Sequence, residues 1–160
     1  MDWIRAEHGL IKEDILEYLE NLIDEERKLE HQLVVYVGTD AQRKGRGHSH
    51  KFVSMIALVS EGKGGKLMYS IFTEKRKIGL NEKLLTEVQK SIEVAYLINP
   101  LLEKYNIKMQ IHVDINSNPK WASHKSMAQA LGYIVGMGYD YRFKPNALCA
   151  SFCADRYAKK

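Results

Sequence analysis

The chain has 160 residues and carries 24 Lys and Arg against 20 Asp and Glu, a formal net charge of +4. This length suits one domain that folds without cross-links, and no segment reaches the roughly 18 apolar residues of a membrane span. The two cysteines, Cys149 and Cys153, are too few for a disulfide scaffold, so we expect reduced thiols in a cytoplasmic protein.

The charge is unevenly divided along the chain. Residues 1–32 hold 10 acidic and 4 basic side chains, whereas residues 33–160 hold 10 acidic and 20 basic ones. A basic body attracts polyanions through long-range steering and counterion release, which makes nucleic acid a natural partner. A basic surface that serves solubility alone is the alternative interpretation.

The first half of the chain predicts a helix followed by three antiparallel strands. Apolar residues recur at helical spacing over residues 12–30, so we expect an amphipathic helix there. Strands are predicted at residues 33–40, 52–60 and 66–73. Residues 41–51 read as a polar, glycine-bearing loop and residues 61–65 as a turn, so the three strands form a meander.

The second half alternates helices with strands. A long helix is predicted from Asn81, its N-cap, with a kink or a second short helix at Pro100. A strand at residues 108–114, a loop, a helix at 123–137, a strand at 139–143 and a final helix at 147–158 follow. Helical connections between strands imply right-handed crossovers and parallel pairing, so we expect a mixed sheet flanked by helices.

Two of the predicted strands end in an aspartate, Asp40 and Asp114. If these strands lie parallel and adjacent, both carboxylates emerge at one edge of the sheet, close enough to share a divalent cation. An acid at the end of a buried strand costs several kcal/mol unless a positive group compensates it. A metal ion, a Lys or Arg, or a helix N-terminus can do so, and an Asp that merely starts a turn is the structural alternative.

Glu87 and Asp155 are candidates for further ligands. Glu87 lies beside the apolar stripe of the long helix and can turn toward the sheet; a solvated glutamate at the helix edge is the alternative. Asp155 lies in the predicted final helix, where an ion pair with Arg156 or Lys159 is the alternative. Magnesium takes oxygen ligands in octahedral geometry, so carboxylates from different elements suit it.

Basic residues follow the first and third predicted strands. Such residues can hold phosphates beside the acids, because backbone contacts position a nucleic acid without reading its sequence. Solvated hairpin tips are the alternative. His112, two residues before Asp114, is interpreted as a buried core histidine rather than a group that tunes the site. The candidate phosphate-binding residues are Arg43, Lys44, Arg46, Lys51, Lys75, Arg76 and Lys77.

Five short segments, in this order, resemble the ribonuclease-H-like superfamily, and more narrowly its YkuK-type branch of predicted bacterial nucleases. The resemblance covers about residues 33–160 and leaves residues 1–32 as an appended N-terminal helix. The segments are Val37-Gly38-Thr39-Asp40-Ala41-Gln42, Glu61-Gly62-Lys63-Gly64-Gly65, Leu84-Leu85-Thr86-Glu87-Val88, His112-Val113-Asp114 and Ala154-Asp155-Arg156.

This resemblance implies an α/β fold with a five-stranded mixed sheet whose first and fourth strands are adjacent and parallel. It also implies that Asp40, Glu87, Asp114 and Asp155 form the catalytic and metal-binding set. Glu82 and Glu93 compete with Glu87 for the helix position. The basic residues that follow Asp40 depart from the usual pattern of the superfamily.

We therefore expect a nuclease that uses Mg²⁺ or Mn²⁺ to hydrolyse phosphodiester bonds in RNA, DNA or a hybrid, with no membrane association. A binding module that keeps the fold but does not cleave is the main alternative. In a third interpretation, the acidic N-terminal helix docks a partner or a second copy of the chain, and covers the basic body until it is displaced.

Overall fold

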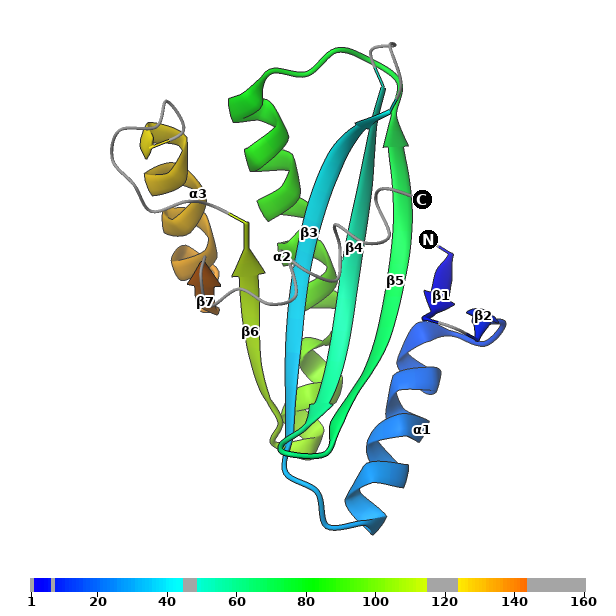
Figure 1. The fold of residues 1–160 in the computed structure, drawn as a ribbon. Helices are drawn as coiled ribbons and strands as arrows, with labels where there is room; N and C mark the ends of the chain where they lie inside the picture. Colours follow the sequence, from blue (N-terminus) through cyan, green and yellow to red (C-terminus); the bar gives the residue numbers. More distant parts are fainter. Residues whose placement is uncertain (1, 7, 45–48, 115–123, 144–160) are drawn as a thin grey trace.

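The computed structural model describes residues 2–6, 8–44, 49–114 and 124–143 (Figure 1). Within these ranges the chain forms a seven-stranded sheet and three helices. The strands are β1 (Trp3–Arg5), β2 (Gly9–Leu10), β3 (Leu33–Lys44), β4 (Ser49–Ser60), β5 (Gly64–Glu74), β6 (Lys108–Val113) and β7 (Asp140–Phe143). The helices are α1 (Ile15–Lys28), α2 (Leu80–Tyr105) and α3 (His124–Gly136).

The sheet is mixed, with the strand order β2-β1-β5-β4-β3-β6-β7. Strands β3, β4 and β5 pair antiparallel as a meander, whereas β6 lies parallel to β3 and β7 parallel to β6. The parallel pairs form because α2 and α3 carry the chain back to the other end of the sheet before the next strand begins. The predicted meander and the predicted parallel neighbours are confirmed.

Helices α1 and α2 share one core with the sheet. Leu19 and Ile23 of α1 are fully buried in a cluster with Ile98 of α2 and Val35 of β3. Helix α1 begins where the Asp14 side chain accepts a hydrogen bond from the Leu16 amide at 2.8 Å, which satisfies one of the free donors of the first turn. The predicted amphipathic helix is confirmed, with an apolar face that is part of the main core.

Helix α3 packs in a second cluster, on α2 and β6. Its residues Ala130 and Ile134 are fully buried with Ile92 of α2 and Ile111 of β6. Side chains alternate along a strand, so the odd-numbered residues of β3 and β6 face the helices and the even-numbered ones face away. Asp40 and His112 belong to the second set.

The sheet has two more strands than the sequence predicts. The five predicted strands are present as β3 to β7, and β1 and β2 are added at the edge beside β5. These strands have three residues and two residues, too short for an alternating pattern to show. The free edge of β5 and the burial of Trp3 create β1, and neither is visible from the local sequence.

The β3–β4 hairpin is longer than predicted. Pairing continues past Asp40 to Lys44 opposite Ser49, so the segment predicted as a polar loop over residues 41–51 is mostly strand. Ala41 and His50 are buried in this part of the hairpin, but its run of polar residues shows no apolar alternation and therefore resembles a loop in sequence. At the other hairpin, Gly62 and Gly64 have positive φ angles of 73° and 110° and form the predicted turn between β4 and β5.

Helix α2 runs through Pro100 as one element, so of the two outcomes expected there, a kink or a second short helix, the second helix does not form. A proline removes one helical donor and leaves the carbonyl four residues earlier without its partner. Pro100 and Tyr96 both lie on the exposed side of α2, where water can bond to that carbonyl. The helix begins at Leu80 after Gly79, two residues before the expected start. None of the helices in the described ranges has the length and apolarity needed to span a bilayer.

Candidate functional site

Asp40 lies where β3 and β6 run parallel. The register pairs Gly38 with His112, and two further residues along each chain bring Asp40 level with Asp114, the residue that directly follows β6. Adjacent strands are separated by about 4.8 Å, so this register sets the two aspartates side by side. Asp114 directly follows β6, whereas Asp40 lies inside β3, which continues to Lys44, so the prediction that Asp40 ends its strand is wrong. Asp40 is only 6% exposed and Asp114 is half-buried.

Glu87 reaches the same part of β3 from helix α2. Its Oε1 accepts a hydrogen bond of 3.0 Å from the backbone amide of Ala41, and the side chain is buried. Of the three glutamates that competed on this helix, Glu87 is the one held against β3. Glu82 instead forms an ion pair with Arg76, and Glu93 forms one with Lys90 at 2.7 Å.

Asp40 and Glu87 flank one peptide unit. Side chains alternate along β3, so Asp40 leaves the strand on the face away from α2, while Glu87 meets the amide of the next residue from the helix side. Burial, with the charge of Asp40 adding to it, raises the pKa of Glu87 to about 8 against the lowering effect of Lys83 and the Ala41 amide. Near pH 7 the Glu87 carboxyl therefore mostly keeps its proton, and a positive group beside it favours the loss of that proton.

Lys83 supplies one such group. Its Nζ lies 3.3 Å from Oε1 of Glu87, one helical turn away in α2. Sequence analysis did not predict this contact, because lysine and glutamate four residues apart are common on solvent-exposed helix faces. One feature of the sequence could have indicated it: Glu87 lies beside the apolar stripe of the helix, which places Glu87 and Lys83 at the edge of the core.

A chain of buried hydroxyl groups supports this part of β3. Thr39, directly before Asp40, has its Oγ1 3.0 Å from Oγ of Ser54 in β4 and 3.0 Å from Oγ of Ser91 in α2. Ser91 also donates to the backbone carbonyl of Glu87 at 2.9 Å. The hydroxyls tie α2 to both strands next to the acids. Sequence analysis missed these hydroxyl groups, although Thr39 is next to Asp40 and Ser91 is one helical turn from Glu87.

The oxygen donors fit a hard divalent cation in type, and their mutual repulsion favours one. The described residues do not complete a cage: across residues 2–6, 8–44, 49–114 and 124–143, no three His, Cys, Asp or Glu side chains form a group that can hold a metal ion. Asp155, the fourth predicted ligand, lies outside the described residues, as do Cys149, Cys153 and the predicted final helix.

His112 is a buried side chain, as predicted. Its ring stacks on that of Tyr36 with 4.4 Å between centroids, on the sheet face away from the helices. Burial, with a further contribution from the charge of Arg142, lowers the pKa of His112 to about 4, so the imidazole is neutral at pH 7. It therefore packs beside the aspartates without adding charge.

The predicted phosphate-binding residues are divided by the structure. Arg43 and Lys51 lie on the paired arms of the β3–β4 hairpin, so the prediction of a flexible loop for them is wrong. Arg76 is paired with Glu74 and Glu82. Lys75 and Lys77 are exposed between β5 and α2. The side chain of Lys44 and the whole of Arg46 lie outside the described part of the chain.

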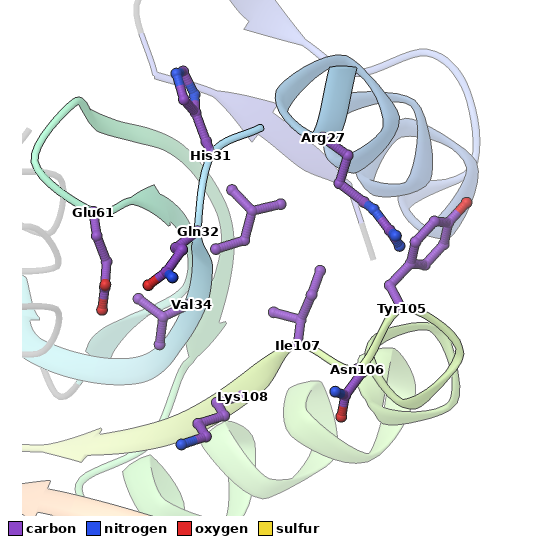
Figure 2. A pocket seen from close by; sticks show the side chains of 10 residues that line it. Arg27, His31, Gln32, Val34, Glu61, Tyr105, Asn106, Ile107 and Lys108 are labelled. Atoms are coloured by element: carbon purple, nitrogen blue, oxygen red, sulfur yellow. The ribbon is translucent and has the colours of Figure 1, made fainter. Parts of the chain in front are cut away.

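A pocket of about 420 Å³ opens at the other end of the sheet (Figure 2). It lies where α1 and α2 end and where β3 and β6 begin, with Arg27 and Tyr105 on one wall and Lys108 on another. The Arg27 guanidinium lies 5.2 Å from the centre of the Tyr105 ring, a cation–π contact that joins the two helices. Of the predicted site residues that the structure describes, none lines this pocket.

Comparison with protein families matches residues 14–159 to the ribonuclease H-like model. The match covers α1 and strands β3 to β7, whereas β1 and β2 precede it. Comparisons with curated proteins and with solved structures find no match. The family, the mixed sheet and the adjacent parallel strands that each lead into an aspartate agree with one another, and the chain belongs to the ribonuclease H-like family.

Proposed function

We propose that this protein is a divalent-metal-dependent nuclease that hydrolyses phosphodiester bonds in nucleic acid. The observation that supports it most is the meeting of Asp40 and Glu87 beside the Asp40–Ala41 peptide of β3, with Asp114 beside Asp40 in the parallel register. Membership of the ribonuclease H-like family favours a nucleic-acid substrate. Asp155 is a fourth candidate metal ligand, predicted from the sequence.

In this proposal the carboxylates of Asp40, Glu87 and Asp114 hold Mg²⁺ or Mn²⁺, with Asp155 completing the set. Such an ion, when bound, lowers the pKa of a water molecule and stabilises charge on the phosphate. The Ala41 amide and the hydroxyls of Thr39 and Ser91 keep the Glu87 carboxylate and its helix in place. Exposed Lys75 and Lys77 lie between β5 and α2, where they can contact phosphates.

A second function is favoured by a specific observation. Lys83 already provides a positive charge to Glu87, and no metal-holding group of three forms within the described residues. A protein that binds nucleic acid through its basic body without cleaving it would need no metal ion beside Glu87. The two candidate functions differ in one measurable property, which is metal-dependent cleavage.

Incubation of the protein with labelled RNA, DNA and hybrid duplex, in Mn²⁺ or Mg²⁺ and then in chelator, tests the proposal. We expect chelator-sensitive cleavage that Asp40→Asn reduces by at least about 100-fold, the scale of losing one preorganised charged group. Asp140→Asn is the matched control, since Asp140 is an exposed strand aspartate at the start of β7. Binding without cleavage in every metal, unchanged by Asp40→Asn, would support the binding module instead.

A further inference from the structure

Strand β7 is one end of the sheet. Its inner side pairs with β6, and no strand of the described ranges pairs with its outer side. An unpaired strand edge presents backbone N–H and C=O groups to which another strand can bond. The strand at the opposite end, β2, has two residues, so β7, with four, is the longer of the two terminal strands.

Asp140 and Arg142 give this edge a self-complementary charge pattern. Both side chains are exposed, and neither forms an ion pair with another described residue. Like charges on an edge strand prevent pairing, because they meet when two copies approach each other. Asp140 and Arg142 have opposite signs and lie two residues apart on one face of the sheet. When two copies of β7 pair antiparallel about Tyr141, each Asp140 therefore lies opposite the partner's Arg142.

This register is the one self-pairing of β7 that joins the two charges. Antiparallel pairing centred on Asp140 or on Arg142 sets two like charges opposite each other, which is destabilising. Pairing centred between two residues sets neither charge opposite the other. The sequence of β7 thus selects a single two-fold arrangement, in which both copies contribute the same surface.

Helix α3 adds an uncharged surface on the same side of the molecule. Residues 126–139 contain no charged side chain, although charged residues make up 28% of the chain. Depletion of charge is typical of the core of a protein interface. Val135 is 58% exposed and lines a cavity of about 470 Å³ together with Asp140 and Arg142. The apolar side of α3 and the free edge of β7 are therefore parts of one surface.

The positions of the two elements let both meet their copies at once. Helix α3 packs over β6 and β7, with Ile134 in a cluster that includes Ile111 and Tyr141. Adjacent strands are about 4.8 Å apart, so pairing of β7 with its copy sets the two α3 helices about 10 Å apart, the distance at which helices pack. A stable dimer buries about 1,000 Å² or more, which short strands alone do not supply. The α3 contact supplies the remainder.

We infer that two copies of this chain form a dimer through the α3–β7 surface, which consists of the free edge of β7 and the adjoining side of α3. Each β7 pairs antiparallel with its copy, and the contacts of Asp140 with the partner's Arg142 fix the register. The sheet then continues through both copies. Helix α1 takes no part in this dimer, and the inference does not depend on the proposed nuclease activity.

Charge reversal tests the register, with the oligomeric state measured by sedimentation velocity over a concentration series. We expect the parent protein to be a dimer. Asp140→Arg and Arg142→Asp should each weaken dimerisation at least about tenfold, because each sets two pairs of like charges across the axis. The double variant with both substitutions has opposite charges across the axis again and should dimerise like the parent.

An equimolar mixture of the two single variants is the sharper test. Asp140→Arg has two positive positions in β7 and Arg142→Asp has two negative ones, so each cross-strand pair in a mixed dimer joins opposite charges. We expect a heterodimer in the mixture at concentrations at which each variant alone is a monomer. An interface elsewhere on the chain would not produce this pattern.

Glu61→Arg is the matched control, because it makes the same reversal of charge at an exposed position between β4 and β5 and should leave dimerisation unchanged. If a charge-reversed variant does not fold, Val135→Glu replaces it and should be a monomer, since it places a charge on the uncharged side of α3. A parent protein that stays monomeric throughout the series would overturn the inference. A dimer that both single variants leave intact would overturn it as well.

Discussion

Glu26, near the end of α1, shows how one acidic side chain joins the chain just after α1 to the distant β4–β5 hairpin. Lys66 of β5 lies 2.9 Å from its Oε1, Ser60 donates to its Oε2 at 2.6 Å, and Nδ1 of His31 is hydrogen-bonded to Oε2 at 2.7 Å. These contacts, Lys66 first, lower the pKa of Glu26 to about 2. The folded protein therefore binds a proton at Glu26 less readily than the unfolded chain does.

The stabilisation from Glu26 should consequently be lost on acidification. A carboxyl group with a lowered pKa stabilises the fold above its unfolded pKa, 4.5, and the contribution disappears as the pH falls toward about 2. We expect Glu26→Gln to cost on the order of 1 kcal/mol at pH 7 and nothing near pH 2. Urea denaturation of both proteins across this range measures the difference. A difference that stays constant with pH would contradict the assignment.

At the scale of elements, the end of α2 decides where β6 begins. Asn106 has a left-handed conformation with φ 54°, and its amide bonds to the carbonyls of Leu102 and Glu103. This cap ends the helix and turns the chain, so that Lys108 starts β6 opposite Val34. Because that register later brings Asp114 level with Asp40, the cap is part of what positions the candidate site.

Substitution at Asn106 tests this cap. Asparagine and glycine tolerate the left-handed region, whereas alanine is penalised there by roughly 1–2 kcal/mol. We expect Asn106→Ala to lower the free energy of unfolding by about 1 kcal/mol and Asn106→Gly to leave it nearly unchanged. Thermal or urea denaturation of the two variants gives the comparison. A loss of the same size in both would mean that the Asn106 side chain, and not its backbone, matters.

At the scale of the whole molecule, the acidic N-terminal segment is joined to the basic body. Glu20 pairs with Lys104 at 2.6 Å, and Lys66 contacts Glu25 as well as Glu26. Displacing α1 would break these pairs and expose residues such as Leu19, at a cost of about 1.5–3 kcal/mol for each buried side chain. The packing therefore argues against the interpretation in which α1 covers the basic body until a partner displaces it.

The basic body should make nucleic-acid binding dependent on salt. Each neutralised phosphate releases counterions, so the logarithm of the binding constant falls with the logarithm of salt by about 0.7 per contact for a single strand. We expect Lys75→Gln combined with Lys77→Gln to reduce this slope by about 1–2. Lys28→Gln, an exposed lysine of the acidic α1, is the control. Fluorescence anisotropy over a salt series measures the slopes, and equal slopes would place the phosphates elsewhere.

Local patterns were sufficient for much of this architecture. The spacing of Leu19 and Ile23 predicts α1, and the apolar runs before Asp40 and Asp114 predict two strands that helical crossovers make parallel. Both inferences depend on periodicity and connection rules, which act over a few residues or one crossover. The sequence alone thus determined the meander, the parallel direction of the later strands and the candidate acids Asp40 and Asp114. The adjacency of the two strands was implied only by the family resemblance, and Asp40 lies inside β3 and not at its end.

Other features exist only because distant segments meet. Helical spacing could not choose among Glu82, Glu87 and Glu93; the choice followed once α2 packed on β3 and the Ala41 amide met one carboxylate. The short β1 depends on the free edge of β5. Likewise, the partner of Glu87 and the hydroxyls around Thr39 were decided by packing, since burial, and not residue type, determines which polar groups must find each other.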